Sequence, residues 1–250
     1  MKPVYIVSWL FALAISFVSC DDWLDKTPKD RLYPDVYFKT EDELRLFTNQ
    51  FYNNLVPSAV DIYSESSDLI VKSDLMLEMS GQRIIPDEGN GWNFTALRDI
   101  NFYLQYSHNC TEVNARNRYD GVARFFRAYF YFEKVKRYGD IPWYDKALDS
   151  DDPELYKARD SREFVMQKML EDLDFAIANL PKTKNAYVLT RWTALALKSR
   201  VCLFEGTFRK YHGLEDCEKY LNACVSASET FMNESGYTLY KSGSTPYRDL

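Results

Sequence analysis

The chain has few of the residues that most catalytic and metal sites use. Its 250 residues include two histidines, His108 and His212, and five cysteines with no Cys-x-x-Cys pair. A zinc site of His and Cys ligands is therefore improbable. No His-Glu-x-x-His, Gly-x-Ser-x-Gly or glycine-rich phosphate loop is present. We expect no metal, no cofactor and no enzymatic activity. Two alternatives have no local motif to support them: a cysteine nucleophile with either histidine, and a chance pair of carboxylates of the glycosidase type.

Positive charge is also scarce. The chain has 31 Lys and Arg against 37 Asp and Glu, which gives a net charge of −6, and no basic arm or tail. Because phosphate binding needs a basic face that releases counterions, we expect no nucleic-acid partner. Glycine and proline are few, at 9 each, and 46% of the residues are hydrophobic, which is typical of a globular chain with a substantial core. Aromatic residues are abundant at 16%, which favours stacking surfaces as well as a bulky core.

The hydrophobic run at the start of the chain is too short to cross a bilayer comfortably. Met1 and Lys2 precede this run, residues 4–18, and Cys20 follows it, directly before two acids. This order is typical of a secretory signal. The segment around Cys20 resembles a bacterial lipobox, with small Ser19 before the cut and Phe17 where leucine is usual. We therefore predict a lipoprotein signal peptide over 1–19 and a lipidated tether over 20–39. The alternative is an ordinary cysteine near a signal-peptidase site.

Four further cysteines follow Cys20: Cys110, Cys202, Cys217 and Cys224. An even number in an exported protein permits disulfides but does not require them. The last two would lie on one helix about 10 Å apart along its axis, which is too far for a bridge between them. We expect buried free thiols.

Hydrophobic periodicity predicts helices through most of the chain. A capping box at 40–43 begins the first helix, which Pro57 ends, and residues 58–91 are expected to form irregular, exposed backbone. Thr190 is expected to cap a buried, central helix that is apolar nearly all round and includes Leu203. We predict an all-α fold with long irregular loops, in which antiparallel helical hairpins stack as in a tetratricopeptide-type solenoid. The other helices are expected over 95–109, over 117–138, from a capping box at 160–163 to Pro181, and around 214–228.

The helix over 117–138 has the strongest pattern. One apolar stripe is expected to pack into the core, whereas Arg124, Arg127 and Lys134 fall on another face. Gly139 is expected to cap the helix in a left-handed conformation, and Pro142 prevents its continuation. The stripe consists of Val122, Phe125, Phe126, Tyr129, Phe132 and Val135.

Several segments together resemble the SusD/RagB family of nutrient-uptake lipoproteins. They are CDDWLDKTP at 20–28, EDEL at 41–44, FYNNL at 51–55, ARFFRAYFYF at 123–132, YGDIP at 138–142, and the helix over 190–204. The resemblance implies a lipoprotein of the outer membrane that faces the extracellular side, captures glycans or peptides and forms the lid of a TonB-dependent β-barrel transporter. Asp21 and Asp22 resemble the surface-export signal of such bacteria. Family members are considerably longer, so residues 40–250 are expected to form the amino-terminal helical domain, incomplete at its C-terminus.

Residues for a carbohydrate ligand are expected in the loops after the first helix. Sugars bind where aromatic faces stack on the ring and polar groups bond its hydroxyls. Trp92 and Asn93 offer this combination, near Asp68, Asp74 and Arg83. The alternatives are that the tryptophan packs onto the helix that follows it and that the acids are only solvated.

Two other readings of the function remain open. In the first, the chain would be a helical-repeat scaffold lipoprotein that contacts only proteins. In the second, it would be a truncated relic without function. Glycan binding and scaffolding differ in whether an aromatic cluster is exposed in a groove or buried.

Overall fold

The computed structural model describes residues 36–56, 77, 80–84, 91–239 and 241. The chain divides into two compact units, Met1–Tyr37 and Phe38–Leu250, and every described helix belongs to the second. The α-helices are α3 (Glu41–Leu55), α5 (Thr95–Tyr106), α6 (Val113–Tyr138), α7 (Arg162–Asn179), α8 (Arg191–His212) and α9 (Cys217–Glu234). The described residues also form two short 3-10 helices, η2 (Ser107–Asn109) and η3 (Pro153–Tyr156). The described residues form no sheet, only an isolated bridge between Ile141 and Asp160.

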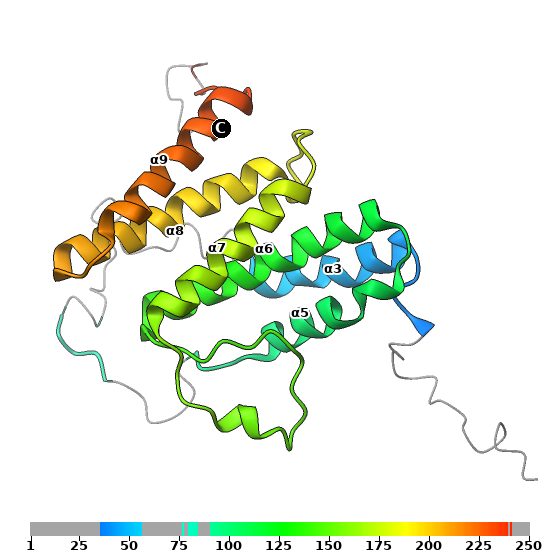
Figure 1. Cartoon of the computed structure of the whole chain (residues 1–250), viewed down its shortest axis with the longest axis horizontal. Helices are drawn as coiled ribbons and strands as arrows, with labels where there is room; N and C mark the ends of the chain where they lie inside the picture. Colours follow the sequence, from blue (N-terminus) through cyan, green and yellow to red (C-terminus); the bar gives the residue numbers. More distant parts are fainter. Residues whose placement is uncertain (1–35, 57–76, 78–79, 85–90, 240, 242–250) are drawn as a thin grey trace, which may run out of the picture. The chain divides into compact units, whose positions relative to one another are not determined.

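Consecutive helices pack against each other as hairpins (Figure 1). Helix α6 packs against α7, α7 against α8, and α8 against α9, while α3 and α5 lie against α6. The predicted all-α fold of stacked helical hairpins is confirmed. Of the irregular segment expected at 58–91, most lies outside the described residues, and residues 80–84 and 91 have no regular structure.

Two helix starts follow the sequence closely. The Thr40 hydroxyl accepts a hydrogen bond from the Glu43 backbone N–H at 3.3 Å, and the Glu43 carboxylate accepts one from the Thr40 N–H at 3.1 Å. Thr190 caps α8 through the same reciprocal pair with Thr193. Both boxes satisfy backbone donors that a helix start leaves without partners. Gly139 ends α6 with a φ of 71°, the positive value that suits a residue without a Cβ. Its ψ of −110° differs from the predicted left-handed cap.

Other helix ends differ from the prediction. Helix α6 begins at Val113 rather than near residue 117, because its first turns already bury Ala115 and Tyr119. Helix α5 ends at Tyr106, and the predicted stretch to residue 109 tightens into η2.

The capping box expected at 160–163 does not form. Ser161, not Asp160, is the N-cap of α7, and its hydroxyl accepts from the Phe164 backbone N–H at 3.3 Å. This shift by one residue moves Glu163 out of the third helical position, so its carboxylate cannot reach the cap. It accepts instead from the Tyr220 hydroxyl at 3.1 Å.

Helix α6 is buried on more than one face. The predicted stripe lies in the core, except that Tyr129 is only half-buried. The prediction that Arg127 falls on a face separate from the core is wrong, because α7 covers that face and Arg127 is 7% exposed. Its guanidinium forms a bidentate pair with Asp172 of α7, at 2.7 and 2.8 Å.

Helix α8 is less central than predicted. Trp192, Leu195 and Val201 are buried, but Leu203 is 50% exposed because α7 and α9 leave part of the helix uncovered. At Gly206 the helices α8 and α9 come so close that a Cβ would lie 2.7 Å from Leu221 Cδ2. The glycine therefore sets the spacing of this hairpin.

The described cysteines are unpaired. Cys110 and Cys202 are buried as expected, whereas Cys217 and Cys224 are partly exposed. No group of three or more His, Cys, Asp or Glu that could hold a metal ion occurs in the described part of the chain. None of the helices described has both the length and the apolar character that a membrane span requires.

Candidate functional site

The structure describes only some of the predicted site residues. Cys20, Asp68 and Asp74 lie outside the described residues. Arg83 is exposed, in a segment that residues 85–90 separate from Trp92. Trp92 and Asn93 directly precede α5, and their side chains make different contacts.

Trp92 forms a platform that is anchored to the fold and partly open to solvent. Its indole lies edge-to-face with Phe94 and Tyr138, with ring centroids 5.3 and 4.9 Å away. Phe94 in turn packs on Phe130 of α6 at 5.7 Å. The Trp92 side chain is 40% exposed, and the Arg159 guanidinium lies over it, 4.9 Å from the ring centroid. The Trp92 side chain therefore packs onto the fold and still leaves part of its ring open to a ligand.

Asn93 lies at the edge of a hollow of about 600 Å³. Its Oδ1 accepts a hydrogen bond from the Thr95 backbone N–H at 2.8 Å, which leaves the amide NH₂ available to donate. The side chains around the hollow combine amides, carboxylates, an ammonium group and aromatic rings. They include Asn54, Asn93, Asp99, Tyr129, Phe130, Glu133 and Lys134. This donor and acceptor set suits a ligand with many hydroxyl groups.

Burial changes the ionisation of two groups that line this hollow. It raises the pKa of Asp99, against the opposing charge of Arg98. It also lowers the pKa of Lys134, and the neighbouring charge of Arg137 lowers it further, whereas Glu133 opposes both. Each shift disfavours the charged form, as expected for groups removed from water.

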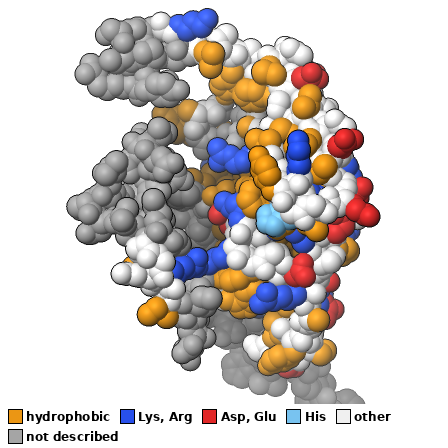
Figure 2. Space-filling view, turned by 90° about the vertical axis from the view of Figure 1, so that its left-hand side faces the viewer, with side chains coloured by type: hydrophobic (Ala, Val, Ile, Leu, Met, Phe, Trp, Pro, Cys, Tyr) orange, Lys and Arg blue, Asp and Glu red, His pale blue; other side chains and the backbone are white. Residues whose placement is uncertain are grey.

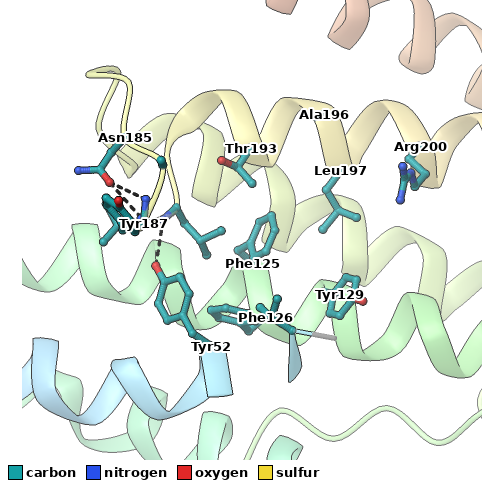
Figure 3. A pocket seen from close by; sticks show the side chains of 14 residues that line it. Tyr52, Phe125, Phe126, Tyr129, Asn185, Tyr187, Thr193, Ala196, Leu197 and Arg200 are labelled. Carbon is teal, nitrogen blue, oxygen red and sulfur yellow. Dashed lines mark hydrogen bonds between the residues drawn. The ribbon is translucent and has the colours of Figure 1, made fainter. Parts of the chain in front are cut away.

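A second hollow, the aromatic groove, lies between α3, α6, α8 and the loop before α8 (Figure 3). Its volume is about 500 Å³, and Tyr129 lines both it and the hollow at Asn93. Tyr187 in the loop is 90% exposed. The groove is lined by Tyr52, Val56, Phe125, Phe126, Tyr129, Asn185, Ala186, Tyr187, Val188, Leu189, Thr193, Ala196, Leu197 and Arg200.

Hydrogen bonds hold the aromatic groove in shape. The Leu189 backbone N–H donates to the Tyr52 hydroxyl at 3.0 Å, and Asn185 Oδ1 accepts from the Tyr187 N–H at 2.7 Å. Burial raises the pKa of Tyr52 more than the Leu189 bond lowers it, so its hydroxyl keeps its proton at neutral pH. Arg200 has no hydrogen bond or ion pair within the described residues. The groove thus combines aromatic faces with hydrogen-bond donors.

No pattern in the sequence predicts these residues as the lining of a groove. Tyr129 belongs to the apolar stripe of α6, and only its hydroxyl distinguishes it from the phenylalanines around it. Tyr187 stands in a polar loop between two helices, which is an available signal for an exposed aromatic residue. Tyr52 and Arg200 carry no local signal, because their neighbours in the groove come from other helices.

Charge is unevenly spread over the surface. Figure 2 shows one face of the molecule, on which Lys and Arg side chains lie among hydrophobic ones while Asp and Glu side chains are mostly toward one edge. The net charge of −6 therefore does not make every face acidic.

A protein-family model matches more than half of the chain. The family model, SusD-like and described as starch-binding and associating with the outer membrane, matches residues 52–191. The SusD-like protein P38 of Formosa agariphila is 25% identical over 226 residues, which are 82% of this chain and 43% of that protein. The chain thus spans less than half the length of this curated relative.

Solved structures share the fold. A SusD-like protein from Bacteroides fragilis is 23% identical, with a TM-score of 0.60 over 86% of this chain and 42% of that one. NanU of B. fragilis is 20% identical, with a TM-score of 0.63 over 85% of this chain and 46% of that one. At these identities the likeness concerns the fold alone.

Proposed function

The chain belongs to the SusD-like family, and on this premise we propose that it captures glycans at the outer membrane and delivers them to a TonB-dependent β-barrel transporter. The observation that carries the proposal is the family match over 52–191, because this range contains Trp92, Asn93 and most of the aromatic groove. Peptides are the second ligand class of this proposal. The protein acts by binding, without catalysis.

The exposed aromatic groove supports glycan binding over a scaffold role. Sugar rings present apolar C–H faces that stack on aromatic side chains, while their hydroxyls need donors and acceptors beside them. Trp92 supplies a partly exposed ring, and Asn93 lies at a polar hollow that Tyr129 connects to the groove. A scaffold for proteins alone needs neither the hollow nor this set of polar side chains.

We assign the stacking contact to Trp92 and hydroxyl contacts to Asn93. Asp68, Asp74 and Arg83 remain proposed contacts from the preceding loop. Asp99 and Lys134, which line the hollow with Asn93, join them. Their carboxylate and ammonium groups complement hydroxyls as acceptor and donor.

A lipid anchor at Cys20 is part of the same proposal. With residues 1–19 as the signal peptide and 20–39 as a tether, acyl chains on Cys20 would hold the helical domain, 40–250, at the extracellular side of the outer membrane. Each buried CH₂ contributes about 0.8 kcal/mol, so a multiply acylated cysteine needs no helix across the membrane.

Affinity electrophoresis in gels that contain single polysaccharides tests the binding role. Trp92→Ala is expected to weaken binding by about 1 to 3 kcal/mol, because it removes the stacking ring. Tyr211→Ala is the matched control, since Tyr211 is 82% exposed on α8 and lines neither hollow. If a folded Trp92→Ala protein binds every retained polysaccharide unchanged, Trp92 does not contact the ligand.

A detergent pull-down of the native membrane protein tests the partner. The wild-type chain is expected to co-purify with a large β-barrel protein, whereas Cys20→Ala, which cannot be acylated, is expected to lose membrane attachment. A wild-type chain that is recovered alone from the membrane would contradict the transporter role and favour the scaffold or the relic.

A further inference from the structure

A small hollow beside Trp92 is lined mostly by cations. Its volume is about 380 Å³, and its lining consists of Gly91, Glu133, Lys134, Lys136 and Arg137. Three of these side chains are positive and one is negative. The lining therefore has more cations than anions, in a chain with a net charge of −6.

The single carboxylate does not neutralise the cations around it. Glu133 pairs with Lys136 at 2.7 Å. The Lys134 ammonium donates instead to the backbone carbonyl of Gly91, an uncharged acceptor, and lies 4.9 Å from the centroid of Phe130. Lys134 therefore has no ion pair with any residue that the structure describes.

Gly91 lets a second cation approach the start of the Trp92 segment. A Cβ at Gly91 would lie 3.1 Å from Arg137 Nη1, and its φ of 82° is one that other residues rarely adopt. The guanidinium thus lies close to the backbone that leads into the aromatic platform. Burial lowers the pKa of Lys134, and the charge of Arg137 lowers it further, whereas Glu133 opposes both.

Arg159 brings one more cation to the same place from a different segment. It precedes α7, is exposed, and its guanidinium lies 4.9 Å from the centroid of the Trp92 ring. It has no ion pair or hydrogen bond with any residue that the structure describes. An arginine over an aromatic ring keeps its donors at the edge of the guanidinium plane available to a carboxylate or sulfate.

The helix dipole explains only part of this cluster. Lys136 and Arg137 lie in the last turn of α6, where cations stabilise the negative end of a helix. Arg159 belongs to no helix, and Lys134 lies outside the residues that contribute at the last turn. Arg159 lies over the exposed ring of Trp92, and Lys134 binds the carbonyl of the adjacent Gly91. Together they indicate recognition of an anion beside an apolar face.

We infer that the glycan captured at Trp92 is anionic, with carboxylate or sulfate groups on its sugars. One sugar ring stacks on Trp92, and its anionic group lies between Arg159 and the cations of the hollow. The inference rests on the proposed glycan-binding function and narrows its substrate class. A polyanion would be repelled by an acidic protein, so local positive charge is what such binding requires.

Matched polysaccharides test the charge preference directly. Polygalacturonate is compared with its methyl ester, which removes the carboxylate charge, and dextran sulfate is compared with dextran. The full chain is expected to bind one charged member at least about tenfold more tightly than its neutral partner. Which pair shows the difference separates carboxylate from sulfate. The preference is expected to shrink as salt rises from 0.05 to about 0.5 M.

The neutral polysaccharides separate this inference from the function on which it rests. Starch and xyloglucan are included as uncharged ligands. Binding of neutral polysaccharides as tight as, or tighter than, that of the charged ones overturns the inference and leaves the glycan-binding function standing. Binding of no polysaccharide at all overturns both.

Variants then locate the preference. Arg159→Gln is expected to reduce the charged-to-neutral affinity ratio about tenfold, because a charge-assisted contact becomes a neutral one. Arg159→Lys keeps the charge and is expected to retain part of the ratio. Lys210→Gln, an exposed lysine of α8 outside all three hollows, is the control that leaves the ratio unchanged. Equal ratios for Arg159→Gln and Lys210→Gln in folded proteins overturn the assignment.

Discussion

Helix α6 packs in two different ways on its two sides. Toward α3 the contact is aromatic: Phe126 is 1% exposed, and its ring centroid lies 6.0 Å from that of Phe51 and 5.0 Å from that of Tyr52. Toward α7 the contact is ionic: Arg127 forms its bidentate pair with Asp172, and both side chains are buried.

The ionic side connects more elements than the two helices that form it. Arg127 Nη1 donates to the Asn101 side-chain oxygen on α5 at 3.2 Å, and the Asn101 amide donates to the Tyr144 carbonyl at 2.8 Å. Arg124 also approaches Asp172, at 3.6 Å. Asp172 and Asn101 therefore supply acceptors to the buried guanidinium of Arg127, which would otherwise lack hydrogen-bond partners.

The two sides should fail differently when they are altered. Aromatic packing consists of many small contacts, so a smaller apolar side chain loses only some of them. A buried ion pair depends on two partners, and removal of one leaves the other charge desolvated without compensation.

Asp172→Ala is expected to have the largest effect. It leaves the Arg127 guanidinium buried and without its anion, which costs about 3 to 5 kcal/mol in the free energy of unfolding. Urea denaturation followed by circular dichroism measures this loss. Asp174→Ala is the matched control on the same helix, because Asp174 is 58% exposed and pairs with Lys198 at the surface. The control is expected to lose less than about 1 kcal/mol. Equal losses in the two variants would show that the buried pair stabilises the fold no more than the surface pair does.

Phe126→Leu tests the aromatic side and is expected to cost less. The substitution keeps an apolar side chain at a fully buried position but removes ring contacts, for a loss of about 1 to 2 kcal/mol. The same urea experiment measures it, with Phe164→Leu as control because Phe164 is 39% exposed on α7. A loss as large as that of Asp172→Ala would remove the contrast between the two sides of α6.

This contrast also explains what the sequence could predict. The stripe of α6 and the capping box at Thr40 lie within one helix or one turn, so their spacing is visible in the sequence. The partner of Arg127 is 45 residues away in the chain, and no local pattern identifies it. Ion pairs between helices therefore escape prediction even where the helices themselves are correct.

The same reason applies to the candidate site. The sequence predicts Trp92 and Asn93 as site residues because an aromatic and an amide residue stand together beside glycines, which is a local signal. The aromatic groove was missed because Tyr52, Tyr187 and Arg200 come from three separate segments. Arg159 was missed as well, since only the fold brings it over Trp92.

A second ionic cluster lies at the start of α7. Its alteration is expected to change the free energy of unfolding least, and in a way that depends on pH. The Glu163 carboxylate pairs with Arg209 and with Lys219, at 3.3 Å from the latter, and accepts from the Tyr220 hydroxyl at 3.1 Å. Burial alone would raise the pKa of Glu163, but Arg209, Lys219 and Tyr220 together lower it below its ordinary value.

Because the pKa of Glu163 is lower in the folded state than in the unfolded one, its stabilising effect is present above the unfolded pKa, about 4.3. The effect is lost as the pH falls through the folded pKa. At pH 7 Glu163→Gln is expected to lower the free energy of unfolding by less than about 1 kcal/mol, since solvent screens a carboxylate that is 43% exposed. At a pH below the folded pKa of Glu163, the variant and the wild type should unfold alike. Glu229→Gln, at an exposed acid of α9 beyond its first turn, is the control and should unfold like the wild type at pH 7. A difference for Glu163→Gln that persists unchanged at low pH would mean that the amide disturbs packing and that the ion pairs do not stabilise this end of α7.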